Sequence, residues 1–215
     1  MNLYVVRHYK TLINAESRIM GWGDSPPVDG WELDLLAVSR RLKKAGIQFD
    51  RIYTSQLKRA QATGEFFARR HEVEKINSVA AVNEVNYGKL FRKSKGWVAK
   101  NIPEYKTDPD FVFPNGESFT QMRERSVGFV QHLLTKLPDE DVLLVAHAGV
   151  IRGLVCHYLG LPYAPNLKQR VSHRYIGLFE FDGERCRKYD ELGSHSDFVR
   201  KQIIKIPFLS LIHIS

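Results

Sequence analysis

Apolar residues along the chain form two kinds of pattern, short unbroken runs and longer stretches at helical spacing. The short runs predict strands at residues 3–6, 52–53 and 142–146. An alternating run predicts a late strand at 175–181, joined by a turn at Asp182-Gly183 to another at 185–191. Helical spacing predicts helices at 31–44, 57–70 and 117–137, and a further one after His147 that ends near Gly160. Strands alternating with helices indicate an α/β fold, a three-layer sandwich with a mainly parallel central sheet and helices on both faces.

Turn-forming residues mark the ends of these elements. Asp29 is the expected N-cap of the helix at 31–44, and Gly46 is its expected stop. Residues 84–116 are rich in turn formers, which predicts a lid or substrate-specificity insert. We expect residues 1–202 to form a single domain, because a chain of 215 residues is long enough for one sizeable core. The tail at 203–215 is apolar and patternless. It could add a last strand or be a non-native extension, and it receives no role.

Cysteine content and hydropathy exclude several classes of protein. Cys156 and Cys186 are too few for a disulfide framework or a four-cysteine zinc site, and they suit a reducing compartment. The N-terminal apolar run is interrupted by Arg7 and His8, so it resembles neither a secretory signal nor a transit peptide. No apolar stretch approaches the ~20 residues that a membrane-spanning helix needs. We therefore expect a cytoplasmic protein that does not enter the membrane.

The positive charge is concentrated in one part of the chain. A net charge of +8 suits nucleic acid, a membrane surface or an anionic small molecule as partner. Residues 40–100 hold 15 Lys and Arg against 5 Asp and Glu, whereas the rest of the chain nets −2. Part of this excess is expected on solvated helix faces, at Arg40, Arg41, Lys43, Lys44, Arg69 and Arg70. A second basic run, at Lys89, Arg92, Lys93 and Lys95, lies in the predicted loop.

Two histidines follow predicted strands. Arg7-His8 ends the first strand, and His147 ends the most apolar one, with Arg152 five residues later. Sites in open α/β sheets form outside the carboxyl ends of the strands. A basic motif at residues 55–60 adds a third element, so we expect these groups to form a site together. The other histidines have no metal-ligand spacing, and His173 receives no role.

Short motifs then follow one another in an order that resembles the histidine phosphatase superfamily, in its phosphoglycerate mutase-like branch. The resemblance runs from residue 2 to about 192. The motifs are Arg7-His8, Asn14, Gly21-Trp22-Gly23-Asp24-Ser25-Pro26, Ser55-Gln56-Leu57-Lys58-Arg59-Ala60, Glu84 with Tyr87-Gly88, Pro114-Asn115-Gly116-Glu117-Ser118 and Val145-Ala146-His147-Ala148-Gly149.

The resemblance implies a phosphatase that works through a phosphohistidine. His8 would attack phosphorus, with its other ring nitrogen donating to a backbone carbonyl. Glu84 would protonate the leaving oxygen and then activate water. Arginine forks suit phosphoryl oxygens, which assigns Arg7 and Arg59 to the phosphate. His147, the backbone N–H of Ala148 and the amide of Asn14 would add donors. Further substrate-binding residues are expected at Gly21, Trp22, Ser25, Arg92 and Lys93, with packing as the alternative role of Trp22.

No metal or cofactor is required by this chemistry, and the expected partner is a phosphorylated small molecule. Nucleic acid is not expected, because aromatic residues do not interleave with the basic ones. The clearest departure from the family pattern is Tyr9, where the family has glycine, so its ring must turn away from the phosphate or narrow the pocket. Two other functions stay open: a phosphoglycerate mutase-type phosphotransferase, and a catalytically weak pseudoenzyme or anion-binding protein. The substrate and the oligomeric state are not predicted.

Overall fold

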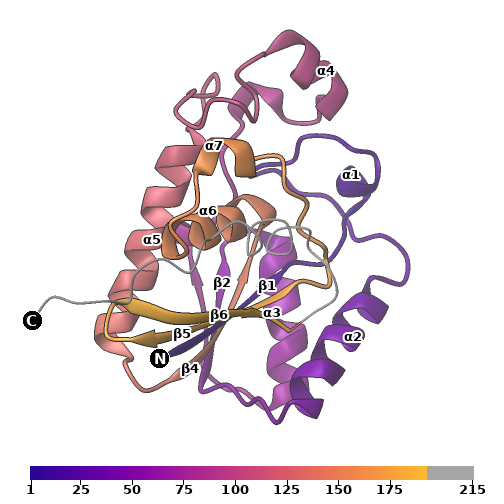
Figure 1. Ribbon diagram of the computed structural model, residues 1–215. Coiled ribbons are helices and arrows are strands. Elements are labelled where there is room, and N and C mark those ends of the chain that lie inside the picture. Colours follow the sequence, from indigo (N-terminus) through magenta and orange to yellow (C-terminus); the bar gives the residue numbers. More distant parts are fainter. Residues whose placement is uncertain (193–215) are drawn as a thin grey trace, which may run out of the picture.

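A computed structural model describes residues 1–192 and contains one six-stranded sheet in the order β3-β2-β4-β1-β5-β6 (Figure 1). Strands β3, β2, β4 and β1 are parallel to one another, while β5 runs antiparallel to β1 and to β6. The predicted α/β fold with a mainly parallel sheet is thereby confirmed. The strands are β1 (Asn2–Arg7), β2 (Arg51–Ser55), β3 (Ile76–Val79), β4 (Asp141–Ala146), β5 (Ile176–Asp182) and β6 (Arg185–Glu191).

Helices cover both faces of this sheet. Helices α2 and α3 pack on one face and α5 and α6 on the other (Figure 1). The α-helices are α1 (Leu12–Ala15), α2 (Trp31–Lys44), α3 (Lys58–His71), α4 (Lys95–Asn101), α5 (Phe119–Lys136), α6 (Ala148–Tyr158) and α7 (Tyr163–Asn166). Two short 3-10 turns, Ala80–Val82 and Gly88–Leu90, lie between β3 and α4.

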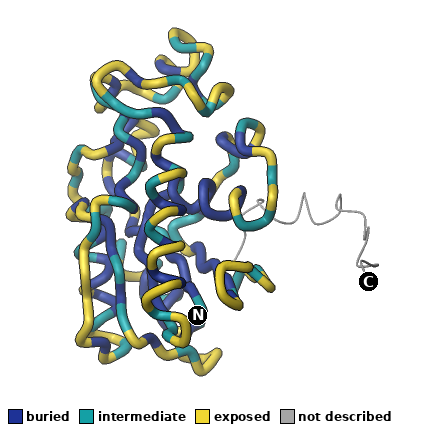
Figure 2. Tube along the Cα trace, turned by 90° about the vertical axis from the view of Figure 1, so that its left-hand side faces the viewer, coloured by how far each residue is buried: buried dark blue, intermediate teal, exposed yellow. Residues whose placement is uncertain are grey.

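Burial on both faces explains why the central strands read as unbroken apolar runs. In β1, Leu3 and Val5 belong to the core under α5 and α6, whereas Tyr4 and Val6 belong to the core under α2 and α3. Such strands need apolar residues at every position and not at alternate ones. Figure 2 shows the result, with buried residues through the middle of the molecule and exposed ones along the outer helix faces.

Most predicted elements are present, with boundaries shifted by only a few residues. The prediction of Asp29 as an N-cap was wrong: Gly30 occupies that position with a φ of 69°, and no side chain caps the helix. Strand β3 was missed because its residues lie mostly exposed at the sheet edge and its sequence, INSV, is half polar. The expected tail at 203–215, and the end of the expected domain at 202, lie outside the described residues.

The segment at 84–116 contains a short helix, α4, and is joined to the main core by aromatic rings. Tyr87 packs on Phe113 at 4.8 Å between ring centroids, and Phe113 packs on Phe119 of α5 at 5.5 Å. Gly88 is required here, because a Cβ would lie 2.1 Å from the Pro114 carbonyl oxygen. The segment is therefore anchored at both of its ends, and α4 projects beyond the carboxyl ends of the parallel strands (Figure 1).

The burial pattern predicts a stability difference between two leucine truncations. Leu144 in the middle of β4 is fully buried, whereas Leu33 on α2 is 66% exposed. Leu144→Ala should lower the free energy of unfolding by about 2–5 kcal/mol, because it leaves a cavity in the core. Leu33→Ala should change it by less than about 0.5 kcal/mol. Denaturant unfolding measures both, and similar losses in the two variants would contradict this account of the core.

Candidate active site

The carboxyl ends of three neighbouring strands bring the candidate site together. In the order β2-β4-β1, Ser55 ends β2, while His147 and His8 directly follow β4 and β1. The rings of His8 and His147 lie 4.9 Å apart between centroids, and both are almost completely buried, at 2% and 0% exposure. The structure therefore brings these two histidines together at one edge of the sheet.

His8 is held in a single tautomer by its own backbone. Its Nδ1–H donates to the Tyr9 carbonyl oxygen at 2.6 Å, as expected, and this leaves Nε2 without a proton. Arg59 Nε donates to that Nε2 at 3.3 Å. Burial, followed by the positive charge of Arg59, holds the pKa of His8 well below its usual range. The ring is therefore neutral and carries a free electron pair on Nε2.

His147 is oriented by Ser55. The Ser55 hydroxyl oxygen accepts from the Leu57 N–H at 3.3 Å and lies 2.6 Å from His147 Nε2. With the hydroxyl donating to Nε2, the proton of the neutral ring sits on Nδ1. Burial and the charge of Arg59 also hold the pKa of His147 well below its usual range. Among the described residues nothing bonds to this buried Nδ1, so its donor is unused within that part of the chain.

Two arginines, the buried Arg59 and the partly exposed Arg7, have main-chain partners but no carboxylate within ion-pair distance in the described chain. Arg59 donates to the carbonyl oxygens of Gly21 and Gly23 at 2.7 and 2.9 Å. Arg7 donates to the Val171 carbonyl oxygen, and its buried Nε has no partner among residues 1–192. Burial lowers the pKa of Arg7 to about 9 and that of Arg59 to about 10. An anion in the site would relieve the cost of these desolvated charges.

Glu84 reaches the same site from the loop after β3. Its Oε2 accepts from the Gly149 N–H at 3.1 Å, and its Oε1 accepts from the Val85 N–H at 3.0 Å. Gly149 must lack a side chain, because a Cβ would lie 2.1 Å from Glu84 Oε1. The Glu84 carbonyl oxygen accepts from Trp22 Nε1 at 2.6 Å and from Arg125 Nη2 at 3.1 Å.

A cavity of about 930 Å³ opens over these groups. Of the predicted site residues, it is lined by Arg7, His8, Asn14, Gly21, Arg59, Glu84 and Ala148. The side-chain oxygen of Asn14 accepts from the Thr11 N–H at 3.4 Å, which leaves its NH₂ group to face a ligand. His147 lies behind His8, in contact with its ring.

Four predicted substrate-binding residues do not line the cavity. Trp22 supports the Glu84 backbone, and the Ser25 hydroxyl accepts from the Ile13 N–H at 3.1 Å. The Arg92 backbone has a φ of 64°, and its guanidinium lies over the ring of Phe91. The Lys93 ammonium lies 5.0 Å from the centroid of the Trp97 ring. The structure therefore does not bring Arg92 and Lys93 to the cavity.

Tyr9 turns away from the cavity into the opposite core. Its ring packs on Trp31 at 4.6 Å between centroids, and its N–H donates to the Thr63 hydroxyl at 3.1 Å. Of the two outcomes expected for a tyrosine beside the nucleophile, this is the first. The residue leaves the space in front of His8 open and fastens the strand end to α3.

The sequence did not assign several residues that the fold brings to the site. His173 Nδ1 donates to the His8 carbonyl oxygen at 2.7 Å, and its ring lies 5.4 Å from that of His8. Lys10, Lys95, Lys106 and Arg152 also line the cavity. Arg152 could have been found from its position on the helix that follows His147. Lys106 has no such signal, because its position depends on how the segment at 84–116 folds.

Comparison with known proteins identifies the family. A family model described as the histidine phosphatase superfamily (branch 1) matches residues 3–190. The chain belongs to this superfamily. A relative within it, a probable phosphoglycerate mutase GpmB of Cronobacter sakazakii, is 34% identical over 189 residues, which cover 84% of this chain and 85% of that protein.

Solved structures of the superfamily share the fold. The YhfR protein of Bacillus stearothermophilus superposes with a TM-score of 0.77 at 24% identity, covering 90% of this chain and 96% of that one. A mycobacterial glucosyl-3-phosphoglycerate phosphatase, solved with VO3, superposes with a TM-score of 0.75 at 24% identity, covering 88% and 96%. Known relatives in fold and sequence thus carry the names of both phosphatases and mutases, and the specific reaction is taken up below.

Two further findings concern the described residues only. Within residues 1–192, no helix is long and apolar enough to cross a membrane. The same part of the chain holds no group of three or more His, Cys, Asp and Glu residues that could ligate a metal ion.

The buried neutral histidines predict that acid destabilises the protein. Burial, followed by the charge of Arg7, lowers the pKa of His173 to about 2, whereas in the unfolded chain it is about 6.5. The unfolded state therefore binds more protons below about pH 6.5, and the free energy of unfolding falls as the pH falls. His173→Asn, which keeps a donor for the His8 carbonyl, should reduce this slope by up to about 1.4 kcal/mol per pH unit.

Denaturant unfolding of both proteins between about pH 8 and pH 5 measures the slopes. At the alkaline end both histidine states are neutral, so any difference there reports packing alone. A variant that keeps the full wild-type slope would show that His173 is protonated in the folded protein.

Proposed function

We propose that the protein is a phosphatase that hydrolyses phosphomonoesters through a phosphohistidine intermediate. The observation that carries this proposal is the unprotonated Nε2 of His8 beside desolvated arginines that have no carboxylate within ion-pair distance in the described chain. A neutral imidazole nitrogen is a nucleophile, and the surrounding cations attract the dianion that it would attack. A phosphorylated small molecule is the partner in this proposal, which requires no cofactor.

In the first step, Nε2 of His8 attacks phosphorus in line with the leaving alcohol. The N–P bond forms as the ester P–O bond breaks, and protonated Glu84 gives its proton to the leaving oxygen. His8 Nδ1 keeps its proton, which stays hydrogen-bonded to the Tyr9 carbonyl oxygen. The phosphorylated ring is therefore positively charged, and its hydrogen bond to that carbonyl oxygen stabilises the charge.

In the second step, water attacks the phosphorus of the phosphohistidine. Glu84, now a carboxylate, takes a proton from the water, the N–P bond breaks, and inorganic phosphate leaves with His8 restored. The carboxyl group is thus an acid in one step and a base in the next. It returns to its protonated form at the end of each cycle.

Phosphoryl transfer depends mostly on positioning and on stabilisation of charge. Arg7 and Arg59 line the cavity together with His8 and would hold the equatorial oxygens. His147 Nδ1–H, the Asn14 amide and the Ala148 N–H, which starts α6, would add donors. All these groups lie on strand ends, helix starts or anchored loops, so they need little rearrangement when the substrate binds.

A mutase is the second candidate, favoured by the GpmB relative and by the many cations in the cavity. A mutase must hold a second phosphate while the intermediate reorients. The sequence offered the basic run of Lys89, Arg92, Lys93 and Lys95 for such a group. Of these four residues, the cavity is lined by Lys95 alone, and Arg92 and Lys93 lie over the aromatic rings of Phe91 and Trp97. Conversion of 3- to 2-phosphoglycerate with bisphosphoglycerate present separates the two reactions, and turnover faster than phosphate release would favour the mutase.

The nucleophile can be tested with a chromogenic ester. The wild-type protein should hydrolyse p-nitrophenyl phosphate in EDTA, and vanadate should inhibit it. His8→Ala should lower the rate at least about 1,000-fold, because the covalent path is lost. His132→Ala, at an exposed histidine of α5, is the control and should keep the wild-type rate.

Equal rates in His8→Ala and wild type would sink the proposed mechanism. If the wild type binds vanadate but releases no phosphate from any ester, the protein is an anion-binding pseudoenzyme instead.

A further inference from the structure

The cavity extends beyond the groups that would hold the reacting phosphate. Its lining contains ten Lys and Arg residues and only two carboxylates, Asp34 and Glu84. Arg7 and Arg59 face the reacting group, while Arg18 and Arg174 pair with Glu16 and Asp34. The other six have no carboxylate within ion-pair distance in the described part of the chain. They are Lys10, Lys95, Lys106, Arg152, Lys168 and Arg170.

Arg152 is the most deeply placed of these six. It is 5% exposed, and its Nη1 donates to the Gln169 carbonyl oxygen at 3.0 Å. Its Nε is buried without a partner among residues 1–192. A permanent positive charge buried beside other cations is costly unless a counter-charge reaches it. Arg152 lines the cavity, so a counter-charge can reach it there.

Lys95 and Lys106 contribute two more partly buried cations from the segment at 84–116. Burial and then the charges of Arg152 and Lys95 lower the pKa of Lys106 to about 7. Burial and then the charges of Arg7 and Arg152 lower the pKa of Lys95. The three side chains therefore repel one another in the unliganded protein, and an anion between them would relieve both the repulsion and the desolvation.

Resting on the proposed phosphatase function, we propose that Arg152, Lys106 and Lys95 form a subsite for a second anionic group of the substrate. The substrate class is then a phosphomonoester that carries a carboxylate or a second phosphate. Of the basic run that the sequence suggested for such a role, this subsite keeps Lys95 and does not include Lys89, Arg92 or Lys93. A cavity of about 930 Å³ holds a ligand larger than a three-carbon phosphate, so a sugar-sized dianion fits it.

Matched pairs of esters test this subsite. 3-Phosphoglycerate and 6-phosphogluconate differ from glycerol 3-phosphate and sorbitol 6-phosphate by a carboxylate in place of a hydroxymethyl group. Fructose 1,6-bisphosphate and fructose 6-phosphate form the phosphate pair. The wild-type kcat/KM should favour the doubly anionic member of at least one pair by at least about tenfold, the effect of one charge-assisted hydrogen bond.

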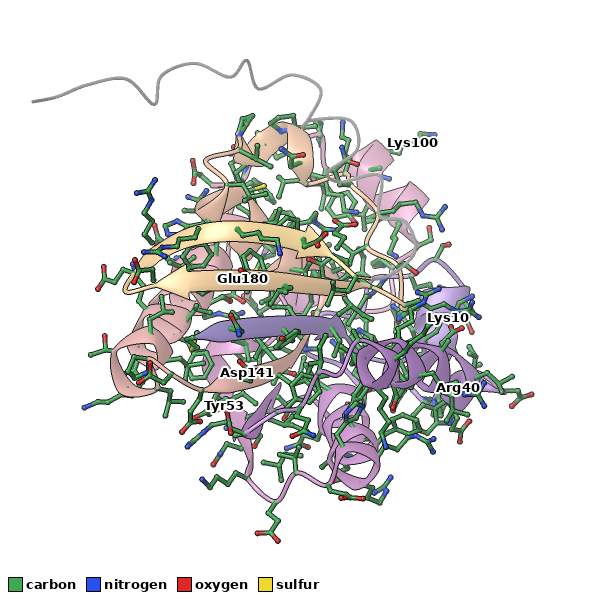
Figure 3. The ribbon with its side chains drawn as sticks, turned by 60° about the horizontal axis from the view of Figure 1, so that its bottom comes forward. Lys10, Arg40, Tyr53, Lys100, Asp141 and Glu180 are labelled. Carbon is green, nitrogen blue, oxygen red and sulfur yellow. The ribbon has the colours of Figure 1, made fainter. Side chains whose placement is uncertain are left out.

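Lys106→Met should reduce that ratio at least about fivefold, since it keeps the length of the side chain and removes its charge. Arg152→Met should reduce it as well, and Lys106→Met keeps the test valid if the buried arginine is needed for folding. Lys100→Met is the control: Lys100 is exposed and points outward from α4 (Figure 3). The kcat/KM preference of Lys100→Met for the doubly anionic ester should equal that of the wild type.

Binding to His8→Ala separates the subsite from the reaction. Calorimetry with this variant should show the same preference for the doubly anionic member without turnover. If neither member is hydrolysed by the wild type but this preference persists, the proposed phosphatase function fails and the subsite stands. If both members of every pair bind and react within about twofold of each other, or if Lys106→Met behaves as Lys100→Met does, the subsite is overturned.

Discussion

The main-chain pairing of β1 with β4 is the interaction on which the site depends. Because the two strands are parallel and in the register Arg7↔Ala146, the residues that follow them leave the sheet side by side. Apolar side chains on both faces fix that register, since a slip by one residue would turn each of them to the wrong core. The distance between His8 and His147 is therefore set by the same contacts that hold the sheet together.

Positive charge in excess of the negative charge around it is the second constraint on this molecule. Arg7, Arg59 and Arg152 are removed from water by the fold and are held by main-chain carbonyl oxygens. Carbonyl oxygens fix the direction of a guanidinium but do not neutralise it. The fold thus keeps charges that weaken the empty protein, a cost that native proteins accept at functional sites. Exposed cations such as Arg40 on α2 (Figure 3) carry no such cost.

Sequence patterns predict the elements whose structure depends on neighbouring residues. They do not predict side-chain positions that depend on packing between different segments of the chain. The strands β1 and β4 could be predicted because burial on both faces leaves an unbroken apolar run. The site histidines could be predicted because they follow those strands. Lys106 could not be predicted, since its place in the cavity depends on how the segment at 84–116 folds around the packed rings of Tyr87 and Phe113. Arg92 was misjudged because nearness to Glu84 in sequence does not reveal a left-handed backbone.

The anchoring of Glu84 has a consequence for repeated turnover. Trp22 and Arg125 bind its carbonyl oxygen, so the residue is fixed through its main chain, which never changes charge. A glutamate fixed instead by an arginine at its carboxylate would lose that anchor at each protonation. In the proposed reaction the carboxyl group, whose oxygens accept from the N–H groups of Gly149 and Val85, would gain and lose a proton while the bonds to the carbonyl oxygen stay unchanged. The hydrogen bonds to the carbonyl oxygen thus hold Glu84 in position, and they do not depend on whether its carboxyl group carries a proton.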